Sequence, residues 1–197
     1  STKTPINRKP IPPRCVIGMI HLGALPGSSL YFRPLHEILS RAVHDALALT
    51  EGGVDGLMVE NFFDSPFAKD KVPPATIAAI TRAVLFIKDQ TDLPIGVNVL
   101  RNDALAALSI AHVCEADFIR CNVFVGAAVT DQGVIEGAAR EIALLKRELN
   151  SQVEVWADVD VKHAVQIGSP DIGSQAADAV ERGRANALIL SGIATGS

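Results

Sequence analysis

The segment Gly56-Leu-Met-Val-Glu-Asn61 decides the fold, because it is a short apolar run that ends on a carboxylate and an amide. A strand of a parallel sheet is buried on both faces, so it reads as a nearly continuous apolar run. The chain holds six such runs, each of which stops at or next to polar residues. α/β proteins place their ligand sites at the carboxyl ends of parallel strands, so the pattern predicts both a fold class and the position of a site. The other five runs are Cys15–Ile20 before His21, Pro94–Val99 before Arg101, Asp117–Ile119 before Arg120 and Asn122, Val153–Ala157 before Asp158, and Ala185–Leu190 before Ser191.

Amphipathic helical segments separate these runs. Apolar residues at helical spacing predict a helix over 35–49, ended by Gly52-Gly53, since glycine is common just after a helix. Strands that alternate with helices imply right-handed crossovers and a parallel sheet. Four more helices are expected: one after Pro73-Pro74, one from Asn102-Asp103 to Val113, one near 138–149 and one near 174–182.

A closed barrel fits this pattern better than an open sheet. The turn after the first run, His21-Leu-Gly-Ala-Leu-Pro-Gly27, is not a dinucleotide-binding fingerprint, and the chain has no P-loop motif. Polar residues end every strand, which favours a (β/α)8 TIM barrel, but the sequence provides only about six of the eight βα units. We therefore expect residues 1–13 to form an extended lead-in, and residues 14–197 to form a single TIM-barrel domain that lacks its last two units.

The composition excludes several classes of protein. The net charge of −4 over 197 residues leaves no broad basic surface, so nucleic acid is not an expected partner. No apolar stretch reaches the ~18 residues that a transmembrane helix needs, so none is expected. The three cysteines form no CxxC pair, which is typical of reduced thiols in a cytoplasmic protein.

Three segments share an order of features that indicates a reused structural unit. Each has a helix end, a tight turn, an Asp or Asn, and then a buried strand. The segments are 51–59, 115–119 and 181–190, and their polar residues are Asp55, Asp117 and Asn186.

The predicted catalytic group comes from the strand ends and consists of Asp158, Glu60, His21 and Lys162. Carboxylates act as general acids or bases when burial and neighbouring charges shift their pKa, and a barrel lysine can form a Schiff base or stabilise an enolate. The alternatives are a solvated Lys162 beyond its strand and a histidine bound to backbone at the start of a loop. No local motif gathers three or four metal ligands, so we expect no metal ion.

The predicted ligand-binding group is led by Arg120. This residue follows a strand that should be buried, and an unpaired buried guanidinium is very costly, so it needs a carboxylate or an anionic ligand. A structural ion pair with Glu60 or Asp158 is the alternative. Amides at strand ends are equally suited to binding a ligand and to holding a loop through backbone hydrogen bonds. The rest of the group is Asn122, Asn98, Asn61 and Ser191.

Two loops and two further residues have simpler expectations. The connection 61–73 is long and contains Phe62 and Phe63, which suggests a lid, a docking surface or a plug for the barrel rim. The glycine-containing segment 124–137 is expected to be a mobile loop or a rigid turn. Arg101 is expected at the surface, and Cys121 is expected to pack in the core.

Several longer segments resemble the BtpA family. Among them are Pro94-Ile-Gly-Val-Asn-Val-Leu-Arg-Asn-Asp103 and Ile189-Leu-Ser-Gly-Ile-Ala-Thr-Gly-Ser197, and the resemblance runs from about Val16 to the end of the chain. It implies a TIM barrel of the ribulose-phosphate-binding type. In cyanobacterial members it also implies a role in the biogenesis and stability of photosystem I reaction-centre proteins, as a peripheral protein at the thylakoid membrane. Other members occur in organisms without photosystems, some beside sugar-metabolism genes.

Two hypotheses of function follow. The resemblance implies an assembly or regulatory factor for photosystem I, with reaction-centre subunits or their assembly machinery as partners. The polar strand ends favour an enzyme or ligand-binding barrel for a small phosphorylated or carboxylated metabolite, with aldol, isomerase or proton-transfer chemistry. Neither hypothesis identifies a cofactor, and both are compatible with a homo-oligomer. Both place the protein in the cytoplasm, peripheral on the thylakoid membrane if its source is cyanobacterial.

Overall fold

A curled parallel sheet forms the centre of the molecule. The computed structural model describes residues 9–160, 163–168 and 171–191. Six strands follow one another in the order β1-β2-β3-β4-β7-β9, and every neighbouring pair is parallel. The sheet order follows the chain order, so each strand extends the same edge, as in the wall of a barrel. The strands are β1 (Ile17–His21), β2 (Gly56–Glu60), β3 (Ile95–Asn98), β4 (Phe118–Cys121), β7 (Glu154–Val159) and β9 (Ala187–Leu190).

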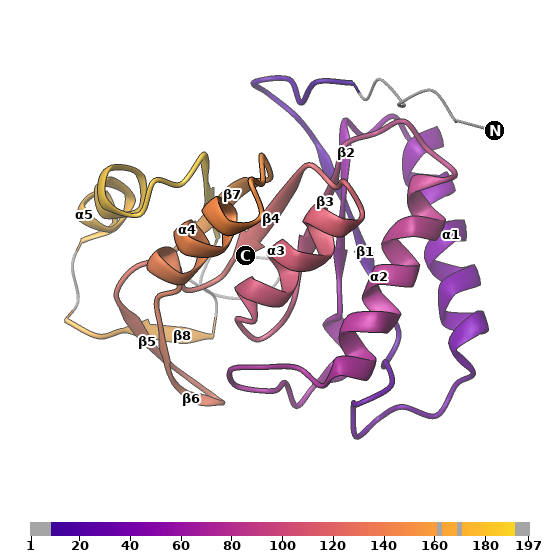
Figure 1. The fold of residues 1–197 in the computed structure, drawn as a ribbon, viewed down its shortest axis with the longest axis horizontal. Coiled ribbons are helices and arrows are strands. Elements are labelled where there is room, and N and C mark those ends of the chain that lie inside the picture. Colours follow the sequence, from indigo (N-terminus) through magenta and orange to yellow (C-terminus); the bar gives the residue numbers. More distant parts are fainter. Residues whose placement is uncertain (1–8, 161–162, 169–170, 192–197) are drawn as a thin grey trace.

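Helices occupy the crossovers and cover one face of this sheet. Figure 1 shows α1, α2, α3 and α4 in succession across the molecule, with the strands behind them. The chain thus has the predicted α/β fold with a parallel sheet, while closure into an eight-stranded barrel stays a prediction. The helices are α1 (Leu35–Glu51), α2 (Pro74–Lys88), α3 (Ala104–Val113), α4 (Ala139–Glu148) and α5 (Ile172–Ala177), which continues into the π-helical turn η2 (Asp178–Arg182).

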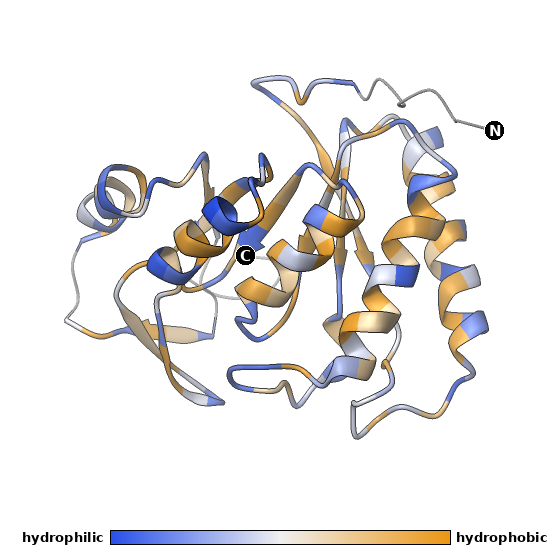
Figure 2. Cartoon of the chain, in the orientation of Figure 1, coloured by the Kyte–Doolittle hydropathy of each residue, from blue (hydrophilic) through white to orange (hydrophobic). Residues whose placement is uncertain are grey.

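The two faces of the sheet pack differently, because side chains alternate along each strand. The outer face packs on the helices in the main hydrophobic core, and hydrophobic colours run along α1, α2 and the strands in Figure 2. On the inner face, the rings of Phe118 and Trp156 stack with their centroids 3.9 Å apart. A Cβ at Gly96 would collide with the ring of Phe118, so glycine is what allows this close approach. The core strand residues of the outer face include Ile20, Val59, Val97 and Ile119.

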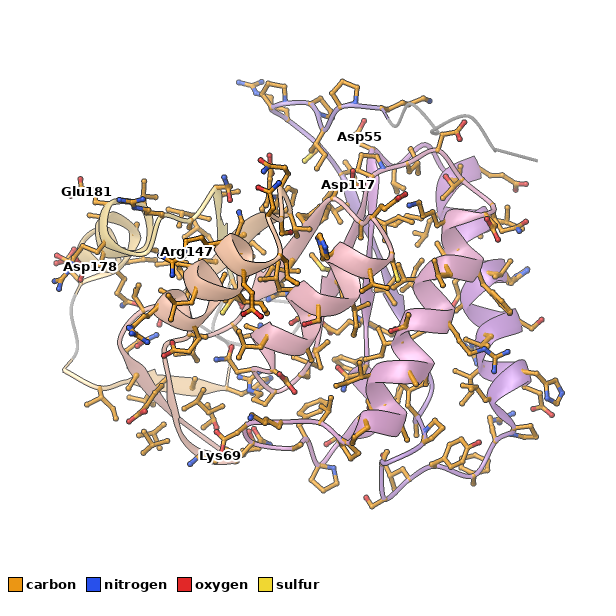
Figure 3. All side chains as sticks on the ribbon, in the orientation of Figure 1. Asp55, Lys69, Asp117, Arg147, Asp178 and Glu181 are labelled. Atoms are coloured by element: carbon orange, nitrogen blue, oxygen red, sulfur yellow. The ribbon has the colours of Figure 1, made fainter. Side chains whose placement is uncertain are left out.

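The repeated segments of the sequence form side-chain braces between strands. Oδ2 of Asp55 accepts the backbone N–H of Val16 at 2.8 Å, and Oδ2 of Asp117 accepts that of Ile95 at 2.8 Å. Asn186 repeats the contact, since its Oδ1 accepts the backbone N–H of Val155 at 2.8 Å. Figure 3 shows Asp55 and Asp117 at the same end of the sheet, opposite Lys69, so the braces lie at the amino ends of the strands. Two residues before each brace the chain takes a positive φ, at Gly53, Glu115 and Arg184.

A second, smaller sheet was not predicted. Strands β5 (Ala127–Thr130) and β6 (Gly133–Glu136) form an antiparallel hairpin, and β8 (Ala164–Gln166) pairs with β5. The expectation of a plain loop over 124–137 is therefore corrected. Gly133 lies at the turn with φ 102°, a value that favours glycine. The hairpin packs on a small core of its own, formed by Val123, Ala128 and Ile135 with Ala164 against them.

Candidate functional site

Arg120, Asp158 and Asn122 form the centre of the site on the inner face of the sheet. Nε of Arg120 donates to Oδ1 of Asp158 at 2.8 Å, and Nη2 donates to Oδ2 at 2.9 Å. Nδ2 of Asn122 donates to the same Oδ2 at 2.9 Å. Arg120 lies opposite Trp156 in the β4–β7 register, so Asp158, two residues further on, stands on the same face beside it. A bidentate pair of this kind fixes both side chains in one geometry.

Burial and charge oppose one another at Arg120. Burial acts to lower its pKa, but the hydrogen bonds and charge of Asp158, together with the charge of Glu60, outweigh burial and raise the pKa above its ordinary value. The guanidinium therefore stays charged. The side chain of Asp158 is only 1% exposed, so its charge depends on this partner for compensation. The structural ion pair considered as an alternative for Arg120 is thus present, and it lies within the group of strand-end residues.

The group extends across β3, β2 and β1 through their last residues, which are Asn98, Glu60 and His21. Nδ2 of Asn98 donates to Oε2 of Glu60 at 2.6 Å, and Nη1 of Arg120 lies 3.9 Å from the same oxygen. Nε2 of His21 lies 3.7 Å from Oε1 of Glu60. The His21 ring also stacks on Phe62 with a centroid distance of 4.3 Å. Arg120 thus stands between two buried carboxylates, and His21 forms the solvent-exposed end of the row.

One polar atom of this group lacks a partner among the described residues. Asn122 is 3% exposed, yet its Oδ1 accepts no hydrogen bond there. The amide orientation is set by the bond from Nδ2 to Asp158. A buried acceptor left unpaired costs about 1–3 kcal/mol, so a group that donates to this atom would bind favourably.

Arg101 belongs near this group, although the sequence interpretation placed it at the surface. It is half-buried, and burial lowers its pKa, while the charges of Asp131 and Asp158 act in the opposite direction. Arg120 adds a repulsive effect of its own. Its position in the sequence could have indicated this. Arg101 follows the carboxyl end of β3, and Arg120 and Asp158 lie at the carboxyl ends of β4 and β7.

Asn61 directly follows β2, as Asn122 directly follows β4. The Asn61 side chain, however, binds the loops beyond the strand ends and not the residues around Arg120. Its Oδ1 accepts the backbone N–H of Leu100 at 2.7 Å, and its Nδ2 donates to Asp64 at 3.0 Å. Asp64 in turn accepts the backbone N–H of Leu25 at 2.7 Å. Burial raises the pKa of Asp64, and these two hydrogen bonds partly offset that effect. Both ends of the Asn61 amide are thus used in linking three loops.

Asp103 makes a second link, between the start of α3 and the connection 61–73. It caps α3 as predicted, since its Oδ1 accepts the N–H of Ala106 at 3.1 Å. Its Oδ2 also accepts the N–H of Val72 at 2.9 Å. The connection 61–73 is therefore fixed near both ends, and Phe62 and Phe63 between them are partly exposed, at 39% and 52%.

Three other residues were assigned a place or a role from the sequence. Lys162 lies outside the described residues. Ser191 directly follows β9 and is half-buried. Cys121 packs in the core as predicted, and burial raises the pKa of its thiol, which disfavours the thiolate form. In the described part of the chain, no cluster of three or more His, Cys, Asp or Glu side chains is arranged to hold a metal ion.

The curled sheet, the outer helices and the polar strand ends define an α/β protein whose parallel sheet curls into a half-barrel. A solved structure with this kind of fold is 7,8-dihydropteroate synthase from Vibrio fischeri ES114, which superposes with a TM-score of 0.59. It covers 98% of this chain and 64% of the synthase at 17% sequence identity, which shows a shared fold and nothing about activity. Across the described residues, no helix combines the length and apolar character that crossing a membrane requires.

The chain belongs to the BtpA family, whose profile matches residues 13–197. It is 51% identical over 191 residues to an uncharacterised protein of Thermococcus kodakarensis, covering 96% of the chain and 69% of that relative. It is 50% identical over 182 residues to the photosystem I biogenesis protein BtpA of Synechocystis, covering 92% of the chain and 63% of that relative. The resemblance found in the sequence is confirmed.

Proposed function

We propose that this chain forms most of a closed (β/α)8 barrel that binds a small anionic metabolite at the carboxyl ends of its strands and acts on it by proton transfer. The observation that carries the proposal is the convergence of Arg120, Asp158, Asn122 and Glu60 on one face of the sheet. The carboxyl ends of barrel strands are where such enzymes hold their substrates.

Two guanidinium groups support binding of a phosphate or carboxylate. Asp158 engages Nε and Nη2 of Arg120, while Nη1 approaches Glu60 only at 3.9 Å, which is beyond hydrogen-bond distance. This edge of Arg120 is therefore available to a ligand oxygen. Arg101 lies close enough for the charges of the site to affect its pKa, and it adds positive potential. The unpaired Oδ1 of Asn122 suits a ligand that also carries a hydroxyl or amide donor.

Glu60 and His21 are the groups best placed to move a proton. Glu60 is buried and oriented by Asn98, while His21 reaches solvent and approaches Glu60 to 3.7 Å. A proton can pass between a substrate and one of these groups, and His21 can exchange it with water. Both carboxylate oxygens of Asp158 are held by donors, so in this proposal Asp158 positions Arg120 and is not the base.

A thermal-shift screen of the full-length protein with phosphate, phosphosugars and small carboxylates tests the proposal. A ligand at 100 times its dissociation constant adds about 2.7 kcal/mol to stability, which is an easily measured shift. The double variant Arg120→Met, Asp158→Asn removes the charged pair together and is expected to abolish the shift. Arg147→Gln in the last turn of α4, shortly before the amino end of β7, is the matched control. If no anion stabilises the wild type, or if the double variant responds equally, the proposal fails.

A role in photosystem I biogenesis is the second candidate, supported by the 50% identity to the Synechocystis protein of that name. The Thermococcus protein is equally similar, so identity alone does not favour this role. Complementation of a Synechocystis strain that lacks its own BtpA is the test, with photosystem I content as the readout. Restored photosystem I by the wild type supports the role. Restoration by the double variant as well would separate that role from the anion site.

A further inference from the structure

A hollow lies beside the polar group, between the β1–α1 connection and the start of α1. Its volume is about 460 Å³, within the range of small-molecule sites. Its apolar lining includes three strongly exposed side chains, Leu30 (53%), Phe32 (78%) and Phe63 (52%). Large apolar side chains gathered around one concave surface mark a binding site more often than single exposed ones do.

The charged lining of this hollow is mainly positive. Arg33 and Arg41 both line it, against the single carboxylate of Glu37. The pair between Nη1 of Arg33 and Oε2 of Glu37 is long, at 3.8 Å, and partly exposed. Arg33 also lies over the Phe32 ring at 5.2 Å, which holds one aromatic wall in place. The surroundings therefore favour a ligand that is apolar and flat on one side and negatively charged on another.

His21 connects the hollow to the group of strand-end residues. It lines the hollow, and its Nε2 lies 3.7 Å from Glu60 on the other side. Its ring is stacked on Phe62, which meets Phe63 edge-on at a centroid distance of 5.4 Å. The two ends of this aromatic row, Phe63 and the proposed proton-transfer residue His21, therefore both line the hollow.

We propose that this hollow is a binding site for an aromatic anion, a flat apolar ring system with one carboxylate, sulfonate or phosphate. The ring system packs among Leu30, Phe32 and Phe63, and the anionic group contacts Arg41 and Arg33. The site is separate from the anion site at Arg120, and its existence does not depend on the reaction proposed above.

Titration of the full-length protein with 8-anilinonaphthalene-1-sulfonate tests the site, because this fluorescent probe has the required chemistry. A single saturable site is expected on the native protein. Phe63→Ser and Arg41→Gln are each expected to weaken binding about tenfold, through loss of an aromatic wall and of a charged contact. Both side chains are exposed, so the fold should persist, and circular dichroism checks it.

An exposed Phe–Arg pair on another helix provides the matched control. Phe86 and Arg82 lie on α2, with the guanidinium 5.6 Å from the ring centroid, and neither lines the hollow. Phe86→Ser and Arg82→Gln are expected to leave probe binding unchanged. Equal losses in both pairs, or no loss in either, would overturn the proposal. The Arg120→Met, Asp158→Asn variant should still bind the probe, which distinguishes this site from the one at Arg120.

Discussion

Taken as whole residues, Asp64 and Asp158 are buried to nearly the same extent, at 8% and 7% exposure, but they are held in different ways. Asp64 accepts the backbone N–H of Leu25 and the side chain of Asn61. Among the described residues, the hydrogen bonds that Asp158 accepts come from side chains, two from Arg120 and one from Asn122. A carboxylate bound to backbone fixes the path of the chain. One bound to other side chains instead arranges a surface that a ligand can meet.

The two asparagines beside these carboxylates make the same distinction. Oδ1 of Asn61 is used on the backbone of Leu100, while Oδ1 of Asn122 has no partner in the described structure. Both asparagines follow a strand, so their position does not show which one holds a loop and which one faces a ligand. The hydrogen-bond partner of each Oδ1 does show it. Mutation in the Asp64 region should therefore change stability alone, whereas mutation in the Asp158 region should change ligand binding and, where it breaks the ion pair, stability as well.

The largest expected effect comes from separating the Arg120–Asp158 pair. Arg120→Met leaves a buried carboxylate without its cation and is expected to cost about 3–5 kcal/mol in urea unfolding. The additional change Asp158→Asn removes that charge, so the double variant should recover part of the loss. A single variant as stable as the double variant would show that the pair is not desolvated as described.

Removal of the Asp64 carboxylate should give the next largest effect. Asp64→Ala leaves the buried N–H of Leu25 unpaired, and the expected loss of stability is about 1–3 kcal/mol. Ligand affinity at Arg120, measured on the folded fraction by calorimetry, should not change. A large loss of affinity would mean that the two regions are not distinct.

Asn122→Leu should show the opposite behaviour. It removes a hydrogen bond to Asp158 but also removes the unpaired Oδ1, so the change in stability should be within about 1 kcal/mol. Ligand affinity is expected to fall about tenfold, because the ligand loses its hydrogen bond to Oδ1 of Asn122. Unchanged affinity in the thermal-shift assay would remove Asn122 from the site.

The smallest effect is a pH dependence from Asp64. Burial raises its pKa in the folded state above the ordinary value of 3.8, so ionisation of Asp64 opposes folding. The stability of the wild type relative to Asp64→Asn should therefore increase as the pH falls from neutral through the raised pKa, and level off below 3.8. Urea unfolding of both proteins from pH 7 to pH 4 measures the difference, and a constant difference would argue against the raised pKa.

Much of the fold could be predicted because strand ends and helix starts are local signals. The runs ending at Glu60, Arg120 and Asp158 indicate parallel strands, and Asp103 indicates the start of a helix. That Arg120 pairs with Asp158 was one of two alternatives, because register between β4 and β7 cannot be read from either strand alone. The structure resolves this alternative by placing both on one face.

The remainder depends on contacts between distant segments. Asn61 binds the backbone of Leu100, 39 residues away, and no local pattern predicts that partner. The hairpin β5–β6 has strands of only four residues each, and one of them begins with glycine, so its pattern resembles a loop. Arg101 was placed at the surface because loop residues are usually solvated, whereas its backbone N–H donates to the carbonyl of Ala68 at 3.1 Å, a partner in a distant loop that no local pattern indicates.

The braces at the amino ends have a consequence for how such a protein arises and assembles. Asp55 ties β2 to the start of β1, Asp117 ties β4 to β3, and Asn186 ties β9 to β7. In the described residues these braces therefore join the strands as successive doublets. Each brace fixes the register within one doublet, and the three repeated segments are the trace that duplication of such a module would leave in the sequence.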